Sequence, residues 1–151
     1  MTVFGLPLHI LLVHAVVVLV PLAATGGLAI ALLRWARLRY GELVLVGAFG
    51  AAVSTYIAQE SGENFAATFE QVSPKMAEHF AIGDSLLVWA VLLFLGVATL
   101  VVAQRLVDRN HSQGRLMLLV GALVTVVSAV VAVVQTVRIG HSGAVAVWGG
   151  L

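Results

Sequence analysis

Apolar residues fall into four long runs, separated by short clusters of charged and polar residues. The runs cover residues 6–33, 43–58, 80–103 and 116–137. A helix needs about 20 apolar residues to cross the hydrocarbon core of a membrane, so the second run also needs its flanks. We therefore expect helices over about 6–33, 41–60, 79–105 and 115–139. The pattern predicts an all-α, integral membrane four-helix bundle that forms a single transmembrane domain over residues 1–151.

Composition supports a chain that lies in a lipid bilayer. Hydrophobic residues make up 61% of the chain and charged residues 10%, whereas about a quarter of a soluble domain is charged. A net charge of +1 without a basic stripe argues against nucleic acid as a partner. The chain has no cysteine, so any bound metal must be held by imidazole, carboxylate or backbone oxygen.

The distribution of positive charge predicts the orientation of the bundle. Six of the eight Lys and Arg residues lie in the connections between the first and second runs and between the third and fourth runs. The other two, Lys75 and Arg138, lie at the opposite ends of the runs. By the positive-inside rule both termini face outward (N-out/C-out), and residues 34–40 form a cytoplasmic turn. The polar segment 59–78, which contains Glu70, then lies outside the membrane.

Two histidines, His9 and His14, lie in the first run. An ionisable side chain in hydrocarbon costs several kcal/mol, roughly 2 to 4, so each is a candidate functional residue. The seven-residue spacing of Pro7, His14 and Pro21 predicts that this stripe faces the bundle interior, with His14 the deepest histidine, about 12 Å along the helix. His9 and His14 are five residues apart, so their side chains point about 140° away from each other on a regular helix and cannot both coordinate one ion.

His79 and His141 are predicted to join them in one layer near the outer ends of the helices. His111 falls in a polar turn on the opposite side and is interpreted as an interfacial residue. Neutral imidazole suits haem iron, copper, zinc or non-haem iron. Arg138, one turn before His141, could pair with a haem propionate.

Three interpretations use these residues. The first is a haem in the bundle core, with room left by small residues on the second and fourth helices. The second is a zinc, copper or iron ion, for which Glu60, Glu63, Glu78 and Asp84 would supply hard oxygen ligands. The third is a cofactor-free structural subunit of a membrane complex, in which Arg138 pairs with an acidic residue.

The chain resembles a family of small bacterial four-helix membrane domains of unknown function, some of which are fused to a Rieske iron–sulfur domain. The resemblance covers the whole length and rests on several spaced motifs. They are Leu6-Pro7-Leu8-His9 with Val13-His14, Ser61-Gly62-Glu63, His79 with Gly83, and Arg138-Ile139-Gly140-His141-Ser142-Gly143-Ala144 with Val147-Trp148. It implies a histidine site within a bacterial cell membrane and a link to electron transfer, without an established reaction.

We interpret the chain as a multi-pass protein of the bacterial inner membrane that binds haem b, similar to a cytochrome b, and passes electrons. His14 and His79 are the first ligand pair, His9 and His141 a second pair or supporting donors, and Arg138 a propionate partner. The alternative metal-ion site uses the four histidines with Glu78 and Asp84. The expected partners are lipid, a respiratory or Rieske-type redox protein and a second copy of the chain. Whether the protein is an enzyme, as part of a membrane oxidoreductase system, stays open.

Overall fold

Four helices, one for each apolar run, make up most of the chain in a computed structural model that describes residues 2–3, 6–67 and 74–148. They are α1 (Leu8–Leu32), α2 (Arg34–Ala66), α3 (Pro74–Asp108) and α4 (Gly114–Trp148). Two short strands, β1 (Thr2–Val3) and β2 (Leu6–Pro7), precede α1 and pair antiparallel, with Thr2 opposite Pro7. Each helix contains a segment long and apolar enough to cross a membrane, which confirms the predicted four-helix membrane domain.

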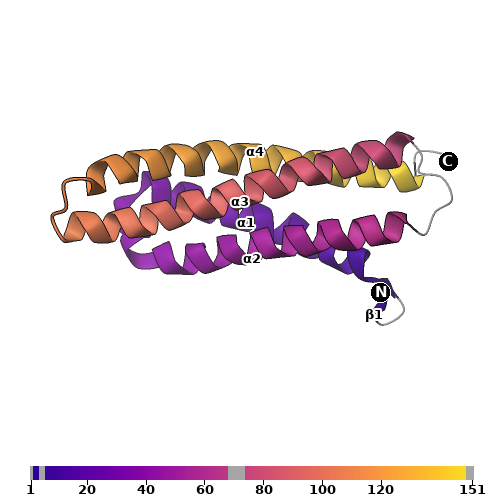
Figure 1. The fold of residues 1–151 in the computed structure, drawn as a ribbon, viewed down its shortest axis with the longest axis horizontal. Coiled ribbons are helices and arrows are strands. Elements are labelled where there is room, and N and C mark those ends of the chain that lie inside the picture. Colours follow the sequence, from indigo (N-terminus) through magenta and orange to yellow (C-terminus); the bar gives the residue numbers. More distant parts are fainter. Residues whose placement is uncertain (1, 4–5, 68–73, 149–151) are drawn as a thin grey trace.

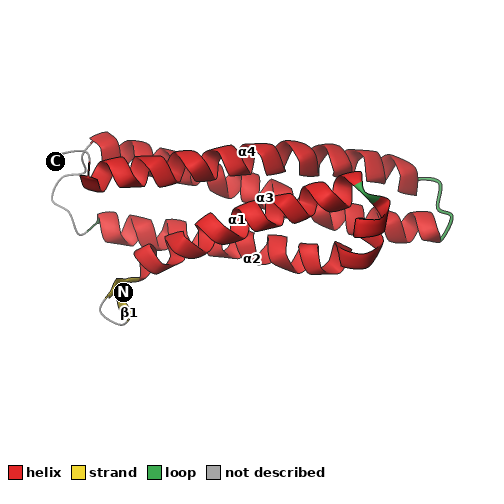
Figure 2. Cartoon of the chain, turned by 180° about the vertical axis from the view of Figure 1, so that it is seen from behind, coloured by secondary structure: helices red, strands yellow, loops and turns green. Residues whose placement is uncertain are grey.

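The helices form an elongated bundle in which each helix runs antiparallel to the next one in the sequence (Figure 1). α1 and α3 lie diagonally opposite, and each packs against both α2 and α4. Figure 2 shows the same arrangement from behind. The helices α1 and α3 begin, and α2 and α4 end, at one end of the bundle, which we call the histidine end. The opposite end, which carries the α1–α2 and α3–α4 connections, is called the arginine end.

The connection between α1 and α2 is shorter than predicted. Residues 34–40 are not a turn but the first turns of α2, and only Leu33 separates the two helices. Arg37 explains how so short a connection is stabilised, because its Nη1 donates to the carbonyl oxygen of Ile30 at 2.6 Å, near the end of α1. The last carbonyls of a helix lack partners within the helix, so this bond satisfies one of them.

The polar segment between the second and third runs is largely helical where it is described. α2 extends to Ala66, and α3 begins at Pro74, a residue that the first turn of a helix tolerates well. Residues 68–73, among them Glu70, lie outside the described residues. The helices α2 and α3 are therefore longer at the histidine end than the apolar runs predict.

Small residues bring α3 and α4 into close contact. A Cβ at Gly96 would lie 2.8 Å from the backbone nitrogen of Thr125, and one at Gly121 would lie 3.1 Å from that of Leu100. The small residues noted on the fourth helix lie on a buried face with two hydroxyl residues, as Thr125, Ser128 and Ala132 are each at most 1% exposed. Close approach of backbones is the usual way in which helices associate in lipid.

The face of α1 that packs into the bundle differs from the prediction. Val16, Val20 and Ala24 are buried, whereas His14 and Thr25 are exposed. The prediction that this stripe faces the bundle interior is therefore wrong at His14, while Pro21 is only partly exposed. The helix is apolar nearly all round, so the spacing of a few residues did not define a buried side.

Candidate functional site

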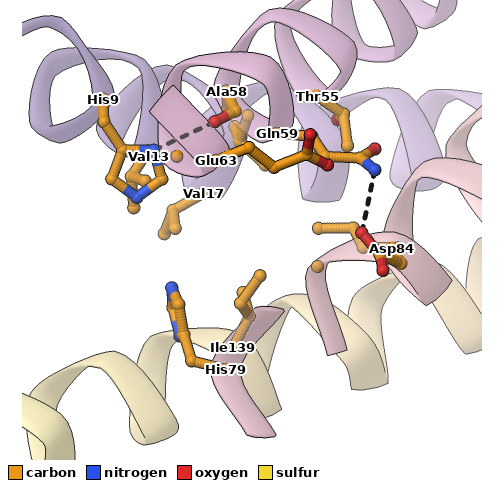
Figure 3. A pocket seen from close by; sticks show the side chains of 14 residues that line it. His9, Val13, Val17, Thr55, Ala58, Gln59, Glu63, His79, Asp84 and Ile139 are labelled. Atoms are coloured by element: carbon orange, nitrogen blue, oxygen red, sulfur yellow. Dashed lines mark hydrogen bonds between the residues drawn. The ribbon is translucent and has the colours of Figure 1, made fainter. Parts of the chain in front are cut away.

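A cavity of about 100 Å³ lies at the histidine end of the bundle, between residues of all four helices. Its polar lining consists of His9, Thr55, Gln59, Glu63, His79 and Asp84 (Figure 3). Valine side chains of α1, with Leu86 and Ile139, supply the apolar part of the wall. The cavity therefore combines two imidazoles and two carboxylates with an apolar surface.

His9 is held at the start of α1 by the end of α2. Its Nδ1 lies 2.9 Å from the carbonyl oxygen of Ala58. A carbonyl only accepts, so Nδ1 carries the proton, and in the neutral ring the lone pair is on Nε2. The ring lies directly against Gly62, where a Cβ would approach its Cε1 to 2.9 Å.

His79 is held at the start of α3 by the end of α4. Its Nδ1 lies 3.0 Å from Oγ of Ser142, and that hydroxyl donates its single proton to the carbonyl oxygen of Ile139 at 3.1 Å. The hydroxyl oxygen therefore accepts from Nδ1–H, and the lone pair of His79 is also on Nε2. Gly143 leaves room for the ring, since a Cβ there would lie 3.3 Å from Cε1.

The two imidazoles extend into the cavity from opposite sides, His9 from α1 and His79 from α3 (Figure 3). Metal-bound histidines commonly donate the second ring N–H to a carbonyl or another acceptor, which orients the ring and leaves the other nitrogen as the ligand. Both rings have this arrangement, so the pair is suited to bind a metal centre through Nε2.

Gln59 and Asp84 join α2 to α3 in the cavity wall. Gln59 Nε2 donates to Asp84 Oδ1 at 2.8 Å, while Gln59 Oε1 is buried and has no hydrogen-bond partner among the described residues. Glu63 contributes a second carboxylate to the same wall. Within the described part of the chain, no group of three or more His, Asp or Glu side chains is arranged to hold a metal ion.

The structure brings together four of the candidate residues named from the sequence: His9, His79, Glu63 and Asp84. Glu60, the other candidate oxygen ligand on α2, is exposed and does not line the cavity. His14 is exposed and does not line the cavity, so it does not face the bundle interior. As their spacing predicts, His9 and His14 do not share one site. His141 and Glu78 are exposed and also lie outside the cavity lining.

Arg138 takes part in a polar chain beside the cavity and not in an ion pair with an acid among the described residues. Its Nη1 donates to Gln135 Oε1 at 3.1 Å, and Gln135 Nε2 donates to Ser85 Oγ at 2.8 Å. The second bond joins α4 to α3. His111 is exposed at the arginine end, as expected for an interfacial residue.

Sequence reasoning missed the residues that orient the two imidazoles. The carbonyl of Ala58 and the close contacts at Gly62 and Gly143 depend on how the helices pack, so no local pattern reveals them. One signal was available, because the dipeptide Ser-Gly occurs at 61–62 and again at 142–143, within motifs already noted for the resemblance.

A comparison with family models matches residues 5–150 to a family described as "Predicted membrane protein (DUF2231)". The match covers nearly the whole chain. No curated protein and no solved structure matches the chain.

Proposed function

We propose that this chain, which belongs to the DUF2231 family of predicted membrane proteins, binds haem b through His9 and His79 and takes part in electron transfer. The observation that carries the proposal is the pair of imidazoles on opposite sides of one cavity, each with Nδ1 hydrogen-bonded and, in the neutral ring, the lone pair on Nε2. Two imidazole nitrogens are a sufficient protein ligand set for a six-coordinate haem iron, whereas most ion sites need three or four.

The chemistry of the lining suits a haem, but the cavity is smaller than a haem requires. Apolar side chains such as Val13, Val17 and Ile139 suit a flat apolar ring. The volume of about 100 Å³ is below the roughly 300–1,000 Å³ of typical cofactor pockets. Binding therefore requires α1 and α3 to separate at the histidine end. When bound, haem iron supplies one-electron redox chemistry, and His9 and His79 fix its ligation.

The proposal is tested by the absorption spectrum of the protein purified after expression with ample haem. We expect a Soret band and a reduced spectrum typical of two histidine ligands. His9→Ala or His79→Ala should remove that spectrum. His14→Ala is the matched control, because this histidine is on the same helix but outside the cavity. A protein without a Soret band, or one that loses it only in His14→Ala, contradicts the proposal.

A zinc, copper or iron ion is a second candidate, which the volume of the cavity favours. Glu63 or Asp84 would have to reorient to join the two imidazoles as an oxygen ligand, since no three such side chains in the described part of the chain are arranged around one ion. A hydrated ion fits in about 100 Å³ without movement of the helices. Elemental analysis of the purified protein separates the two candidates. One equivalent of metal without porphyrin supports the ion, and equal amounts of iron and porphyrin support haem.

We also propose that the histidine end faces the outside of a bacterial inner membrane. The six arginines 34, 37, 39, 105, 109 and 115 are all near the arginine end, and such residues favour the cytoplasmic side. The chain has no cysteine, so Ser112→Cys and Asn64→Cys place single labels at the two ends. A membrane-impermeant maleimide should label Cys at 64 but not at 112 in intact cells. Labelling of Cys at 112 but not at 64 would show that the histidine end faces the cytoplasm.

This orientation defines the class of redox partner. A respiratory or Rieske-type protein that docks outside the membrane would exchange electrons with a centre at the histidine end. Reduction of the haem-loaded protein in membranes by a Rieske-type protein would support this partner. If the Rieske-type protein reduced the haem no faster than a redox protein that docks on the cytoplasmic side, this class of partner would be excluded.

A further inference from the structure

The hairpins α1–α2 and α3–α4 carry the same arrangement of residues at the histidine end. Each has a histidine near the start of its first helix and a Ser-Gly pair in the last two turns of its second helix. In the first hairpin, Ser61 Oγ lies 3.5 Å from Nδ1 of His9. In the second, Ser142 Oγ lies 3.0 Å from Nδ1 of His79.

The two serines bond in the same way to the preceding turn of their helices. Ser61 Oγ donates to the carbonyl oxygen of Ala58 at 2.9 Å, and Ser142 Oγ donates to that of Ile139 at 3.1 Å. Both bonds reach three residues back. Because each hydroxyl proton is used in this way, the oxygen turns a lone pair toward the ring.

The two glycines allow the rings to approach the helix backbone. A Cβ at Gly62 would lie 2.9 Å from Cε1 of His9, and a Cβ at Gly143 would lie 3.3 Å from Cε1 of His79. Gly140 is one turn earlier on α4 but has nothing within 4 Å of the position of a Cβ. The close contact is therefore specific to the glycines next to the serines.

The two halves differ in the acceptor that holds the ring. His9 has the carbonyl of Ala58 at 2.9 Å, nearer than the hydroxyl of Ser61 at 3.5 Å. For His79 the acceptor at 3.0 Å is the side chain of Ser142. A main-chain carbonyl is not removed by a substitution, whereas a hydroxyl is.

We infer that the cavity is built from two half-sites that share one arrangement and differ in the acceptor of the ring, and that Ser142 is a positioning residue that holds His79 in its Nδ1–H tautomer with Nε2 toward the cavity. The inference rests on the proposed function only in that Nε2 is taken as the ligand. Ser61 is dispensable in the matching half, since the carbonyl of Ala58 keeps the proton of His9 on Nδ1.

The experiment uses the full chain, labelled with ¹⁵N-histidine and purified in detergent without added haem or metal. The ¹⁵N shifts of the ring nitrogens, recorded at alkaline pH where the rings are neutral, give the tautomer of each histidine. His9→Gln and His79→Gln assign the signals. In the unmodified protein we expect both histidines to be mainly in the Nδ1–H form.

Ser142→Ala should shift most of the His79 population to the Nε2–H form and leave His9 unchanged. Ser142→Thr should restore the original signal, because it keeps the hydroxyl. Ser61→Ala should leave His9 in the Nδ1–H form. An unchanged His79 tautomer in Ser142→Ala, or an Nε2–H form of His79 in the unmodified protein, overturns the inference.

If Ser142→Ala disturbs folding, two glycine variants test the same half-site. Gly143→Ala should displace the ring and change the His79 signals, whereas Gly140→Ala should not. Equal effects of the two substitutions contradict the inference. Since no haem is present, these results stand apart from the proposed function. Correct tautomers in a protein that never binds haem would overturn the haem proposal alone.

Discussion

Gln59 of α2 donates a hydrogen bond to Asp84 of α3 at 2.8 Å, which ties two helices together in the wall of the two-histidine cavity. Asp84 is exposed and also lines the cavity, so its carboxylate contributes a negative charge to the cavity wall. Asp84 therefore stabilises the helix packing through its bond and affects the cavity through its charge, and two substitutions separate these effects.

Asp84→Asn should remove the charge and keep an acceptor for Gln59. We expect thermal stability to stay within about 0.5 kcal/mol. A nearby negative charge favours the oxidised centre, so its removal should raise the midpoint potential of a bound haem. The corresponding change in the free energy of reduction is on the order of 1 kcal/mol. Asp84→Ala should also lower stability by about 1 kcal/mol through loss of the bond. A redox titration together with thermal unfolding checks both effects, and an equal potential in all three proteins would contradict the first.

Gly96→Ala should destabilise the bundle. The added Cβ would lie 2.7 Å from Oγ1 of Thr125 and 2.8 Å from its backbone nitrogen, so α3 and α4 must move apart. Overpacking of this kind costs typically about 1–3 kcal/mol. Gly47→Ala is the control, because nothing lies within 4 Å of a Cβ there. Thermal unfolding in detergent, followed by helical circular dichroism, should give a lower midpoint for Gly96→Ala alone.

Arg37→Lys should weaken the connection between α1 and α2. The guanidinium donates both to the carbonyl of Ile30 and, through Nε, to Gln104 Oε1 at 3.0 Å. Lysine keeps the charge but lacks the planar set of donors, so we expect a loss of roughly 1–2 kcal/mol. The control is Arg39→Lys, at an exposed position. The same midpoint for both variants would argue against a role of Arg37 in the connection.

Thr125→Val should leave stability unchanged or raise it. Thr125 Oγ1 is buried and has no hydrogen-bond partner in the described part of the chain, and valine has nearly the same shape. Replacement removes a polar atom whose burial costs about 1–3 kcal/mol when it is unpaired. Thr136→Val should instead lower the unfolding midpoint, because Oγ1 of Thr136 donates to the carbonyl of Ala132 at 2.8 Å. A large loss of stability in Thr125→Val would show that its hydroxyl is bonded.

Hydropathy alone determined the number of helices and their approximate places. Backbone groups cannot stay unpaired in hydrocarbon, so a run of apolar residues that spans the membrane has to be helical. The small face of α4 was predictable for a similar reason, since Gly121, Thr125 and Ala132 repeat at the spacing that permits close packing. The bounds of the helices at their polar ends were not predictable from hydropathy. α2 begins one residue after α1 ends, and Arg37 bonds across that connection to the carbonyl of Ile30, a contact that hydropathy does not reveal.

The sequence by itself determined that His9 and His14 lie on different sides of one helix, because five residues correspond to about 140°. Only the tertiary structure decided which of them faces the bundle. α1 is apolar on every side, so its rotation depends on the neighbours that its surface fits, and Val16 and Val20 are buried while His14 is exposed. The partners of the imidazoles were likewise fixed by packing. The acceptors for His9 and His79 come from α2 and α4, at separations along the chain that carry no periodic signal.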